Sequence, residues 1–361
     1  MAMLAALFAG LAHAAELAEA PFRYTVRTGD TLYTLASKYL SRTADYQIVQ
    51  QLNKVANPRS IPPGTILLIP DALLKTEPVL GEIATFRGAV TVDGQQATVG
   101  TRVQQGSRVE TGANAFVTIR LPDASAISMP SQSRIRVHRL RRVLLTGGLD
   151  RDFVLEIGRS QSIVTPITEP GSTFRVTTPL SVSAVRGTDF RVAFDSAGGR
   201  ALTEVVGGTV GVARDEDTPA TSVPKAFGIV ATANGLDGPT ALLPAPELAQ
   251  MGRTATGVLI TIKPVEGARS YRTQLASDAA FTDVFDEQVT DMPAASFTLS
   301  ASTTFFVRLN AIAPSGLEGL PATYAVGRRI GEADPIAPVR IGPASALAAQ
   351  TAPQEPWRQP L

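Results

Sequence analysis

Cysteine is absent from the 361-residue chain, and only two histidines occur. Without thiols the chain can form no disulfide, no thiolate metal site and no cysteine nucleophile. Zinc peptidases and amidases need several imidazole or thiolate ligands, so the inventory argues against both. His13 lies in the N-terminal apolar segment, which leaves His138 to serve a serine triad, and no strand–turn–helix elbow surrounds any serine. The sequence therefore predicts a protein that is not an enzyme and holds no metal or cofactor.

Charge and long apolar runs are also scarce. Charged residues make up 18% of the chain and aromatic residues 6%, against roughly 25% charged residues in typical globular proteins. The net charge of +1 gives no reason to expect nucleic acid as a partner. Beyond the N-terminus, no run approaches the ~18 apolar residues that a membrane helix needs. The glycine clusters lack the lysine and the helix of a phosphate-binding loop.

Glycine, proline and β-branched residues are plentiful instead. The 30 glycines and 26 prolines punctuate short stretches rich in valine, isoleucine and threonine. This composition favours many short strands joined by turns over long helices. At 361 residues the chain is long enough for two to four domains. We expect a multidomain, mainly β protein.

The first fourteen residues have the character of a signal peptide. The apolar run Leu4–Leu11 precedes Ala12-His13-Ala14, where small residues flank a cleavage position, so the mature chain would begin at Ala15. No Lys or Arg precedes the apolar run, which suggests that the natural start lies upstream. Export to the periplasm or cell envelope is the expectation, and the alternative is a disordered apolar N-terminus.

The stretch from Tyr24 to Pro70 has its own pattern. A short strand, Tyr24–Arg27, leads to a Gly-Asp turn in which the Asp30 carboxylate can accept backbone N–H groups at the start of a helix. The apolar face of that helix recurs at intervals of three and four residues. A second helix is expected from Asp45 to Leu52 and a closing strand from Ile66 to Ile69. The inward residues are Leu32, Leu35, Ala36 and Tyr39 on the first helix, and Tyr46, Val49 and Leu52 on the second.

This β-α-α-β segment closely resembles the LysM domain. The resemblance rests on Tyr24, Val26, the run GDTL at 29–32, Ala36, the pair LN at 52–53 and the ending IPPGTILLIP at 61–70. LysM domains bind chains of N-acetylglucosamine-type sugars, and in bacteria that ligand is peptidoglycan. The resemblance implies a glycan-binding groove between two loops, formed by Gly29, Asp30, Thr31 and Leu32 on one side and by Ile61 and Pro62 on the other. As an alternative to binding sugar, Asp30 would cap the helix and Leu32 would lie in the core.

Glycine recurs every six residues in the next region, at positions 88, 94, 100, 106 and 112. A left-handed β-helix would place an aliphatic residue before each glycine, and that residue is mostly missing. Regularly spaced turns between short strands are therefore the preferred interpretation. Asp93-Gly94 is a strong signal for a two-residue hairpin turn.

An arginine-rich strand follows at SRIRVHRLRRVLL. Arg134, Arg136 and His138 are predicted on one face of it, with Ile135 and Val137 on the other. One interpretation of Arg134, Arg136 and Arg139 is a patch for an anionic partner, such as wall stem peptides or lipopolysaccharide. The alternative is a solvated strand face.

The region from 81 to 213 resembles the FecR domain. The resemblance rests on Thr178-Pro179, on VRGTDFRV at 185–192 and on EVVGGTVGV at 204–212, where a last hairpin is expected at Gly207-Gly208. It implies an all-β domain with a solenoid-like or rolled arrangement of strands. Arg186 is expected to bond turn carbonyls. The familiar FecR proteins restrain a sigma factor across a membrane, but here a LysM-like module precedes the domain and no membrane helix is found, so that role is not carried over.

The C-terminal part shows further strand patterns. One strand is expected at Phe227–Ala231 before a linker, and strands resume near Thr254 with spacing typical of a β-sandwich. The runs VEGARSYRTQLASDAAFTDV and FFVRLNAIAPSGLEG resemble fibronectin type III-like domains, although the inner tryptophan is missing. The Pro- and Ala-rich end is expected to be disordered.

These observations divide the chain into seven segments and leave three hypotheses for its function. The segments are a signal peptide (1–14), a short N-terminal segment (15–23), a LysM module (24–71), a FecR-like domain (79–213), a linker with a trailing strand (214–253), a fibronectin-like sandwich (254–330) and a disordered tail (331–361). The leading hypothesis is a non-catalytic exported protein that binds peptidoglycan glycan strands and presents its β domains to an unknown envelope protein. The alternatives are a periplasmic sensory or regulatory component and a peptidoglycan-cleaving enzyme with paired carboxylates, although the acids after Pro70 are predicted on exposed faces.

Overall fold

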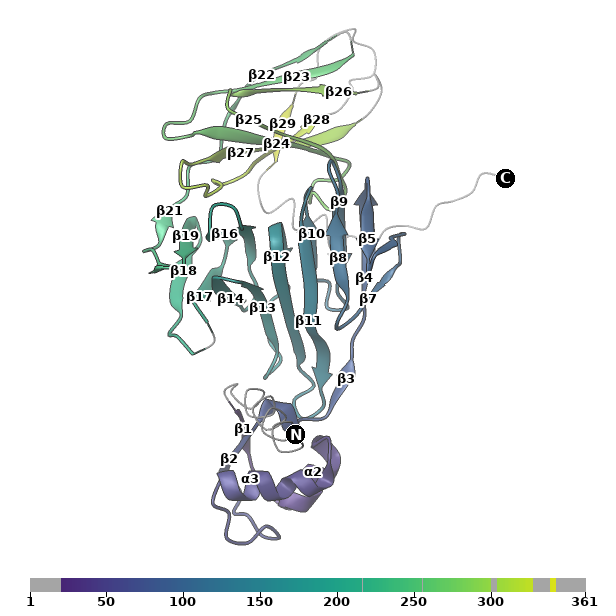
Figure 1. Ribbon diagram of the computed structural model, residues 1–361, viewed down its shortest axis with the longest axis vertical. Helices are drawn as coiled ribbons and strands as arrows, with labels where there is room; N and C mark the ends of the chain where they lie inside the picture. Colours follow the sequence, from purple (N-terminus) through teal and green to yellow (C-terminus); the bar gives the residue numbers. More distant parts are fainter. Residues whose placement is uncertain (1–20, 216, 255, 300–303, 327–337, 342–361) are drawn as a thin grey trace, which may run out of the picture. The chain divides into compact units, whose positions relative to one another are not determined.

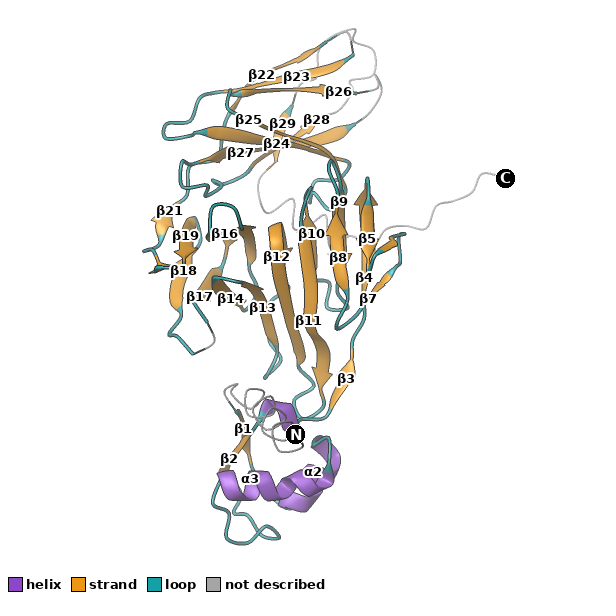
Figure 2. Ribbon diagram, in the orientation of Figure 1, coloured by secondary structure: helices purple, strands orange, loops and turns teal. Residues whose placement is uncertain are grey.

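A computed structural model describes residues 21–215, 217–254, 256–299, 304–326 and 338–341 (Figure 1). The chain forms two compact units. The first unit comprises Met1–Val79, Arg139–Asp152 and Ile167–Phe174, and the second comprises the remainder. Among the described residues, helices occur only in the N-terminal module, and strands dominate elsewhere (Figure 2). The predicted fold class, mainly β and multidomain with a small βααβ module, is confirmed. The predicted signal peptide lies outside the described residues.

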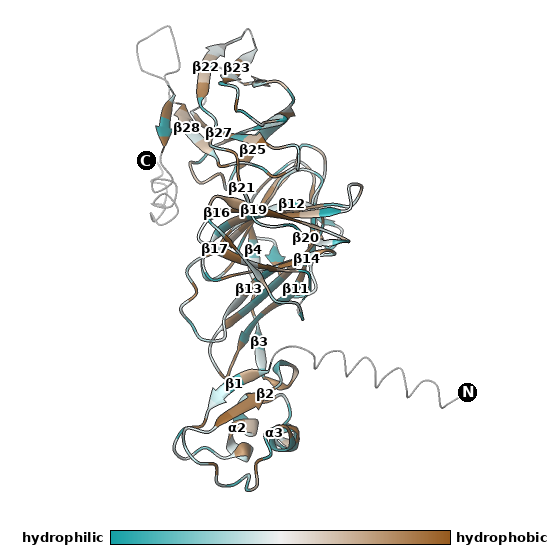
Figure 3. Ribbon diagram, turned by 90° about the vertical axis from the view of Figure 1, so that its left-hand side faces the viewer, coloured by the Kyte–Doolittle hydropathy of each residue, from teal (hydrophilic) through white to brown (hydrophobic). Residues whose placement is uncertain are grey.

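The first unit begins with the βααβ module that the sequence predicts. Strand β1 (Phe22–Thr25) pairs antiparallel with β2 (Ile66–Ile69). Figure 3 colours β2 as strongly apolar, and its residues Leu67 and Ile69 are fully or almost fully buried. Between the strands lie α2 (Leu32–Tyr39), a 3-10 turn η1 (Thr43–Asp45) and α3 (Tyr46–Leu52).

The predicted inward faces of the two helices are largely correct. Leu32, Leu35, Ala36 and Val49 are buried, and Tyr39 and Tyr46 pack half-buried against the same core. Leu52 is the exception, because its side chain is 47% exposed at the last turn of α3. Its neighbour Asn53 instead holds the end of α3 to β2, since its side-chain amide donates to the carbonyls of Val49 and Leu68 and accepts from the Leu68 N–H.

The core of the first unit extends beyond the module. After η2 (Asp71–Leu73), strand β3 (Thr76–Pro78) pairs with residues 141–143 of β11 (Arg134–Val143). Val143 and Leu145 join the apolar cluster of the module. The guanidinium of Arg141 bridges the carboxylates of Asp71 and Asp150. The module therefore shares its core with a segment that lies about seventy residues downstream, which its sequence pattern does not reveal.

Two antiparallel sheets form the larger part of the second unit. The first sheet has the order β7-β4-β9-β10-β12-β15-β16-β19, and both β20 and β21 pair with β19. Its strands are β4 (Gly81–Arg87), β7 (Arg102–Val103), β9 (Phe116–Arg120), β10 (Ala126–Met129), β12 (Leu149–Ile163), β15 (Asp189–Asp195), β16 (Arg200–Gly207), β19 (Phe227–Thr232), β20 (Gly235–Leu236) and β21 (Thr240–Ala241).

The second sheet has two runs of paired strands. One run is β6-β5-β8-β11 and the other is β13-β14-β17-β18. The strands not yet given are β5 (Val90–Val92), β6 (Gln95–Gln96), β8 (Arg108–Thr111), β13 (Thr173–Thr178), β14 (Ser181–Val185), β17 (Thr209–Ala213) and β18 (Thr221–Pro224). Both sheets contribute fully buried aliphatic and aromatic side chains, such as Ile119, Ile135, Phe190 and Val212.

Successive hairpins alternate between the two sheets. The hairpin β13-β14 belongs to the second sheet, β15-β16 to the first and β17-β18 to the second. Each hairpin also pairs with the previous one in its own sheet, through β14 with β17 and through β16 with β19. This is a rolled, solenoid-like arrangement, as the FecR resemblance implies, in which each layer covers the apolar face of its neighbour.

Glycine corners make the changes of sheet possible. Gly187, at φ +99°, joins β14 to β15, and Gly208, at φ +83°, joins β16 to β17. The expected hairpin at Gly207-Gly208 is therefore wrong, because β16 and β17 pair with strands of different sheets. A side chain at Gly208 would come within 2.6 Å of Thr188 Cγ2, so the two corners pack directly on each other. The VRGT and VVGGTV runs mark these two corners.

The six-residue glycine repeat marks turns, as predicted. Gly88, Gly94, Gly100 and Gly106 all have positive φ and lie between consecutive strands from β4 to β8. Asp93-Gly94 forms the predicted two-residue hairpin turn, with φ +54° and +78° and with Val92 paired to Gln95. Positive φ at both central residues matches the twist of the flanking strands.

The C-terminal region forms a two-layer sandwich. One sheet has the order β22-β23-β26 and the other β25-β24-β27-β28-β29. The strands are β22 (Leu248–Arg253), β23 (Gly257–Ile262), β24 (Ser270–Ala276), β25 (Val284–Thr290), β26 (Ala294–Thr298), β27 (Phe305–Ile312), β28 (Ala322–Val326) and β29 (Val339–Ile341). Ile260, Leu275, Phe297 and Leu309 lie in its core. The predicted disorder of the tail is wrong for Val339–Ile341, which pair with β28, and the other residues after 326 lie outside the described part except Pro338.

The segment predicted as a trailing strand and linker is more regular than expected. Its predicted strand is present as β19, and β18, β20 and β21 complete the two sheets around it. Leu242, Leu317 and Leu320 then pack on Ala193 and Leu202 of the first sheet. The two antiparallel sheets described above form what we call the double-sheet region. The sandwich and the double-sheet region consequently share apolar contacts within the second unit.

Candidate glycan-binding site

The six predicted glycan-binding residues lie on two loops that are joined by backbone hydrogen bonds. The Leu32 N–H donates to the Pro58 carbonyl over 2.9 Å, and the Gly64 N–H donates to the Val26 carbonyl over 2.8 Å. The structure therefore brings Gly29, Asp30, Thr31 and Leu32 into one assembly with Ile61 and Pro62, although thirty residues separate the two groups in sequence. Whether these residues bind sugar stays a prediction.

The turn at Gly29 and Asp30 is held from inside the module. Gly29 is exposed at φ +90°, a conformation that favours glycine. The Asp30 carboxylate accepts hydrogen bonds from the Tyr24 hydroxyl over 2.8 Å and from the Arg27 N–H over 2.7 Å. The alternative interpretation of Asp30 as the helix cap is wrong, because these donors come from the residues before it. Asp30 fixes the shape of the loop.

Thr31 is the residue that caps α2. Its hydroxyl accepts from the Thr34 N–H, and its own N–H donates to the Thr34 hydroxyl, each over 3.0 Å. This reciprocal pair satisfies two of the backbone donors that a helix leaves free at its N-terminus. The side chains of Leu32 and Ile61 are 2% and 6% exposed and belong to the core. Because the Leu32 N–H is already bonded to the Pro58 carbonyl, Ile61 is the one of these two that would meet a glycan through its backbone, whereas Pro62 is exposed.

Ionisation of Tyr24 provides a test of this loop. Burial, with the hydrogen bond to Asp30, raises the pKa of Tyr24 to about 12. Because the folded pKa lies above the unfolded value of about 10, the stabilisation is complete below pH 10 and is lost between pH 10 and 12. We expect one tyrosine to titrate near pH 12 by absorbance at 295 nm, and the Tyr24→Phe variant to lack that phase. A titration near pH 10 for every tyrosine would contradict the hydrogen bond.

The arginine-rich strand has the predicted faces but its arginines are paired. Ile135 and Val137 are fully buried, and Arg134 and Arg136 lie on the opposite face. Arg134 forms an ion pair with Glu110 over 3.1 Å, and Arg136 forms one with Glu156 over 3.3 Å. Arg139, in the first unit, is buried against Asp150 and Asp152. These ion pairs favour the structural interpretation over a patch for an anionic partner.

Arg186 does not make the hydrogen bonds that the sequence predicts. Its side chain is exposed, and none of the described residues hydrogen-bonds to it. The expected bonds to turn carbonyls are therefore wrong. The corner is shaped by Gly187 itself, which sits against Pro166 where a side chain would not fit.

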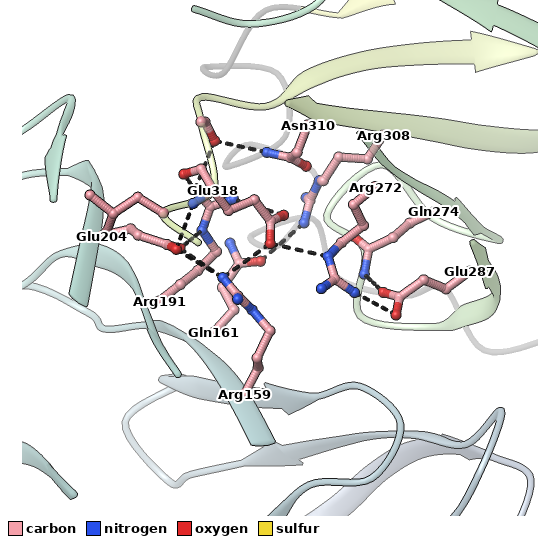
Figure 4. A network of polar contacts seen from close by, with 12 residues as sticks. Arg159, Gln161, Arg191, Glu204, Arg272, Gln274, Glu287, Arg308, Asn310 and Glu318 are labelled. Carbon is pink, nitrogen blue, oxygen red and sulfur yellow. Dashed lines mark hydrogen bonds and ion pairs between the residues drawn. The ribbon is translucent and has the colours of Figure 1, made fainter. Parts of the chain in front are cut away.

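A buried cluster of charges lies in the second unit, where the sequence predicts exposed acids (Figure 4). Glu204 is fully buried and Glu318 is 3% exposed. The Glu204 carboxylate contacts Arg159 over 2.9 Å and Arg191 over 2.8 Å. Glu318 contacts the same two arginines and also Arg272 over 3.1 Å. Each acid is shared by guanidinium groups from separate strands.

This cluster joins the double-sheet region to the sandwich. Arg159, Arg191 and Glu204 come from β12, β15 and β16, whereas Arg272 comes from β24 and Glu318 from the turn after β27. The Glu318 N–H also donates to Glu204 over 2.7 Å. In the sequence, the charged residues of these strands alternate with apolar residues. This pattern predicts only that the charged side chains lie on the outward face of the sheet. The sandwich that covers this face comes from a distant part of the chain.

Glu318 does not have the properties of a general acid. Burial alone would raise the pKa of Glu318, but Arg272, Arg159 and Arg191 lower it to about 2. A catalytic acid that donates a proton near neutral pH needs a raised pKa instead. The described residues also contain no group of three or more His, Asp or Glu side chains placed to hold a metal ion. No helix among them has the length and apolar character needed to cross a bilayer.

Comparison with known families agrees with the two domains. Residues 24–70 match the LysM domain, and residues 107–211 match the FecR protein family. The chain thus carries a LysM domain followed by a FecR domain, which are non-catalytic domains of the binding and regulatory kinds. The fibronectin type III-like resemblance of the C-terminal sandwich stays a prediction.

Two solved structures show limited similarity to the chain. Both are crystal structures of a candidate anti-sigma factor from Parabacteroides distasonis, at 1.65 Å and 2.50 Å resolution. Each is 18% identical, with a TM-score of 0.30, and the match spans 37% of this chain and 60% of the other. No curated protein matches the chain.

Proposed function

We propose that this is an exported, non-catalytic protein of the bacterial periplasm that binds peptidoglycan glycan strands through its LysM domain and presents its FecR domain and sandwich to another envelope protein. The observation that carries the proposal is the pair of joined loops at 26–32 and 58–65, with Gly29 and Pro62 exposed on them. Backbone groups of Ile61 would supply hydrogen bonds to the sugar amides and hydroxyls, while Pro62 would supply an apolar contact.

The internal bonding of the loops supports this function. Tyr24, Arg27 and Thr34 hold Asp30 and Thr31 in place from inside the module, so the loop is ordered before any ligand arrives. A binding site that is ordered in advance loses less conformational entropy when the ligand binds. The lowered pKa of Glu318 also supports a non-catalytic protein, since a catalytic acid needs a raised one.

A second function follows from the FecR match. In this alternative the protein is a periplasmic regulatory component, and the FecR domain recognises a partner in a signal relay. The match to residues 107–211 includes the segment 139–152, whose Val143 and Leu145 belong to the core of the LysM-containing unit. Crosslinking from the FecR domain in cells tests this alternative, and the absence of any specific envelope partner would contradict it.

Substitution at Pro62 tests glycan binding. The full chain is required, because Val143 and Leu145 complete the core of the first unit and an isolated 15–71 fragment would lack them. We expect Pro62→Glu to reduce retention on purified insoluble peptidoglycan at least about tenfold, since a buried charge without a partner costs several kcal/mol. The matched control is Gln47→Glu, which adds the same charge at an exposed position on α3.

Four outcomes of this assay are distinct. Retention of wild type and Gln47→Glu with loss of Pro62→Glu, at equal melting temperatures, supports the proposed site. Equal retention of all three proteins contradicts the site but leaves glycan binding intact. Failure of wild type to bind overturns the proposed function, and release of soluble muropeptides would favour the cleaving enzyme.

A further inference from the structure

The LysM domain carries a positive charge that the rest of the chain does not. Residues 24–70 contain five basic and two acidic side chains, which gives a net charge of +3, whereas the whole chain has a net charge of +1. The remaining residues are therefore negative overall. A positive excess that is confined to one domain attracts ligands of negative charge to that domain.

Most of the basic side chains of the domain have no acidic partner. Asp30 accepts from the Tyr24 hydroxyl and from the Arg27 N–H. Asp45 is 5% exposed and forms an ion pair with Arg42 over 3.0 Å. The other basic side chains are exposed, and none of them forms an ion pair with a described residue. They are Arg27, Lys38, Lys54 and Arg59.

Arg27 and Arg59 lie on the two joined loops. Arg27 follows Val26, whose carbonyl accepts from the Gly64 N–H over 2.8 Å. Arg59 follows Pro58, whose carbonyl accepts from the N–H of the first residue of α2 over 2.9 Å. Each arginine therefore adjoins one of the hydrogen bonds that hold the two sides of the proposed glycan site together.

Hydrogen bonds fix the backbone from which both side chains extend. The Arg27 N–H donates to the Asp30 carboxylate over 2.7 Å, and its carbonyl accepts from the Asp30 N–H over 3.1 Å. The Arg59 N–H donates to the side-chain oxygen of Asn57 over 3.0 Å. The Arg27 charge also acts on the neighbouring turn, because it opposes the rise in the pKa of Tyr24 that burial mainly causes. Neither guanidinium group hydrogen-bonds to a described residue.

The two kinds of glycan that LysM domains bind differ in charge. Chains of N-acetylglucosamine alone are neutral, whereas the stem peptides of peptidoglycan carry free carboxylates. A guanidinium group presents parallel N–H donors that match the two oxygens of a carboxylate, and it stays charged at physiological pH. Two unpaired guanidinium groups on the loops of the site would therefore distinguish the two materials.

We propose that Arg27 and Arg59 bind stem-peptide carboxylates and make the LysM site selective for anionic peptidoglycan over neutral chains of N-acetylglucosamine. This inference rests on the proposed glycan site and adds the charge of the ligand as the property that the site selects. Because both arginines are exposed, they set the preference and its salt dependence, while the loop backbone and Pro62 contact the sugars.

Chemical neutralisation of the ligand tests this preference without any substitution. Purified sacculi are coupled with excess ethanolamine by a carbodiimide, which converts their carboxylates to neutral amides and leaves the glycan unchanged. At roughly 10 mM salt, where the Debye length is about 30 Å, we expect the full chain to be retained about three- to tenfold more on intact than on neutralised sacculi. At roughly 1 M salt, where the Debye length is about 3 Å, the difference should disappear. Equal retention at low salt would overturn the proposal.

Substitution assigns the preference to the two arginines. The double variant Arg27→Gln/Arg59→Gln should be retained on intact sacculi about three- to tenfold less than wild type, and equally to wild type on neutralised sacculi and on chitin. The matched control is Lys38→Gln/Lys75→Gln, which removes two exposed charges of the first unit outside the loops. This control should keep the preference of wild type.

The outcomes separate this inference from the proposed function. Binding of wild type to all three materials, with no loss in the arginine variant, contradicts the charge preference and leaves glycan binding intact. An equal loss of the arginine variant on all three materials also contradicts it, because the arginines would then act on the sugars or on the shape of the loops. Failure of wild type to bind any of the materials overturns the proposed function itself. If the arginine variant does not fold, the comparison of intact with neutralised sacculi decides alone.

Discussion

Replacing Gly187 with alanine is expected to destabilise the second unit by about 2–6 kcal/mol. Two effects add at this corner. The φ of +99° is a conformation that costs a non-glycine residue about 1–3 kcal/mol. A Cβ would also lie 2.6 Å from the Cα of Pro166, so backbone would have to move, at a cost of about 1–3 kcal/mol. Urea unfolding of the full chain, followed by circular dichroism, measures the loss.

Two controls separate these effects. Gly100→Ala has the same conformational strain at φ +84°, but its Cβ would meet no atom within 4 Å, so we expect a cost of about 1–2 kcal/mol. Gly238→Ala has neither strain nor a close neighbour and should be almost neutral. If Gly187→Ala destabilised the protein no more than Gly100→Ala does, the close contact with Pro166 would not contribute to the loss.

Replacing Glu318 with glutamine should cost about 3–5 kcal/mol, because it leaves buried arginines without a counter-charge. Glutamine keeps the size of the side chain, so the cavity term is small and the measured change reports charge. The control is Glu247→Gln, which breaks the exposed ion pair with Lys263. Exposed pairs contribute about 0–1 kcal/mol, and a loss at Glu318 no larger than this would contradict the buried cluster.

The same carboxylate gives a pH dependence with a definite sign. Since the pKa of folded Glu318 is lowered to about 2, its contribution is fully present above the unfolded pKa of about 4.3 and is lost as the pH falls towards 2. We expect the difference in unfolding free energy between wild type and Glu318→Gln to be constant from pH 5 to 8 and to shrink below pH 4. A difference that stayed constant down to pH 2 would count against the contacts with Arg272, Arg159 and Arg191.

Local patterns in the sequence predicted local structure well. The apolar spacing of Leu32, Leu35 and Ala36 identified α2, and Asp93-Gly94 identified its hairpin, because neighbours along the chain decide both features. Leu52 was mispredicted inward because α3 ends at that residue. Asp30 was mispredicted as a cap because the signal of a Gly-Asp pair does not reveal that Thr31 and Thr34 form the capping box.

Features that depend on distant residues could not be predicted in this way. Gly207-Gly208 has the local sequence of a hairpin, and only the pairing of β16 with β19 shows that it is a corner between sheets. Glu204 and Arg191 alternate with apolar residues as an exposed strand face does. They are buried because residues more than one hundred positions away, around Glu318, cover that face.

The sequence alone determined that this chain has a LysM domain ahead of a FecR domain, that it has no thiol and only two imidazoles, and that short strands would dominate. These properties follow from residue types and from spacings of a few positions. The tertiary structure decided which loops meet at Gly29 and Pro62, that the LysM core is completed by Val143 and Leu145, and that Glu204 and Glu318 are buried among arginines. Each of these results depends on packing between residues that are distant in the sequence. That packing decides whether a charged or apolar side chain is buried, and the local sequence pattern does not.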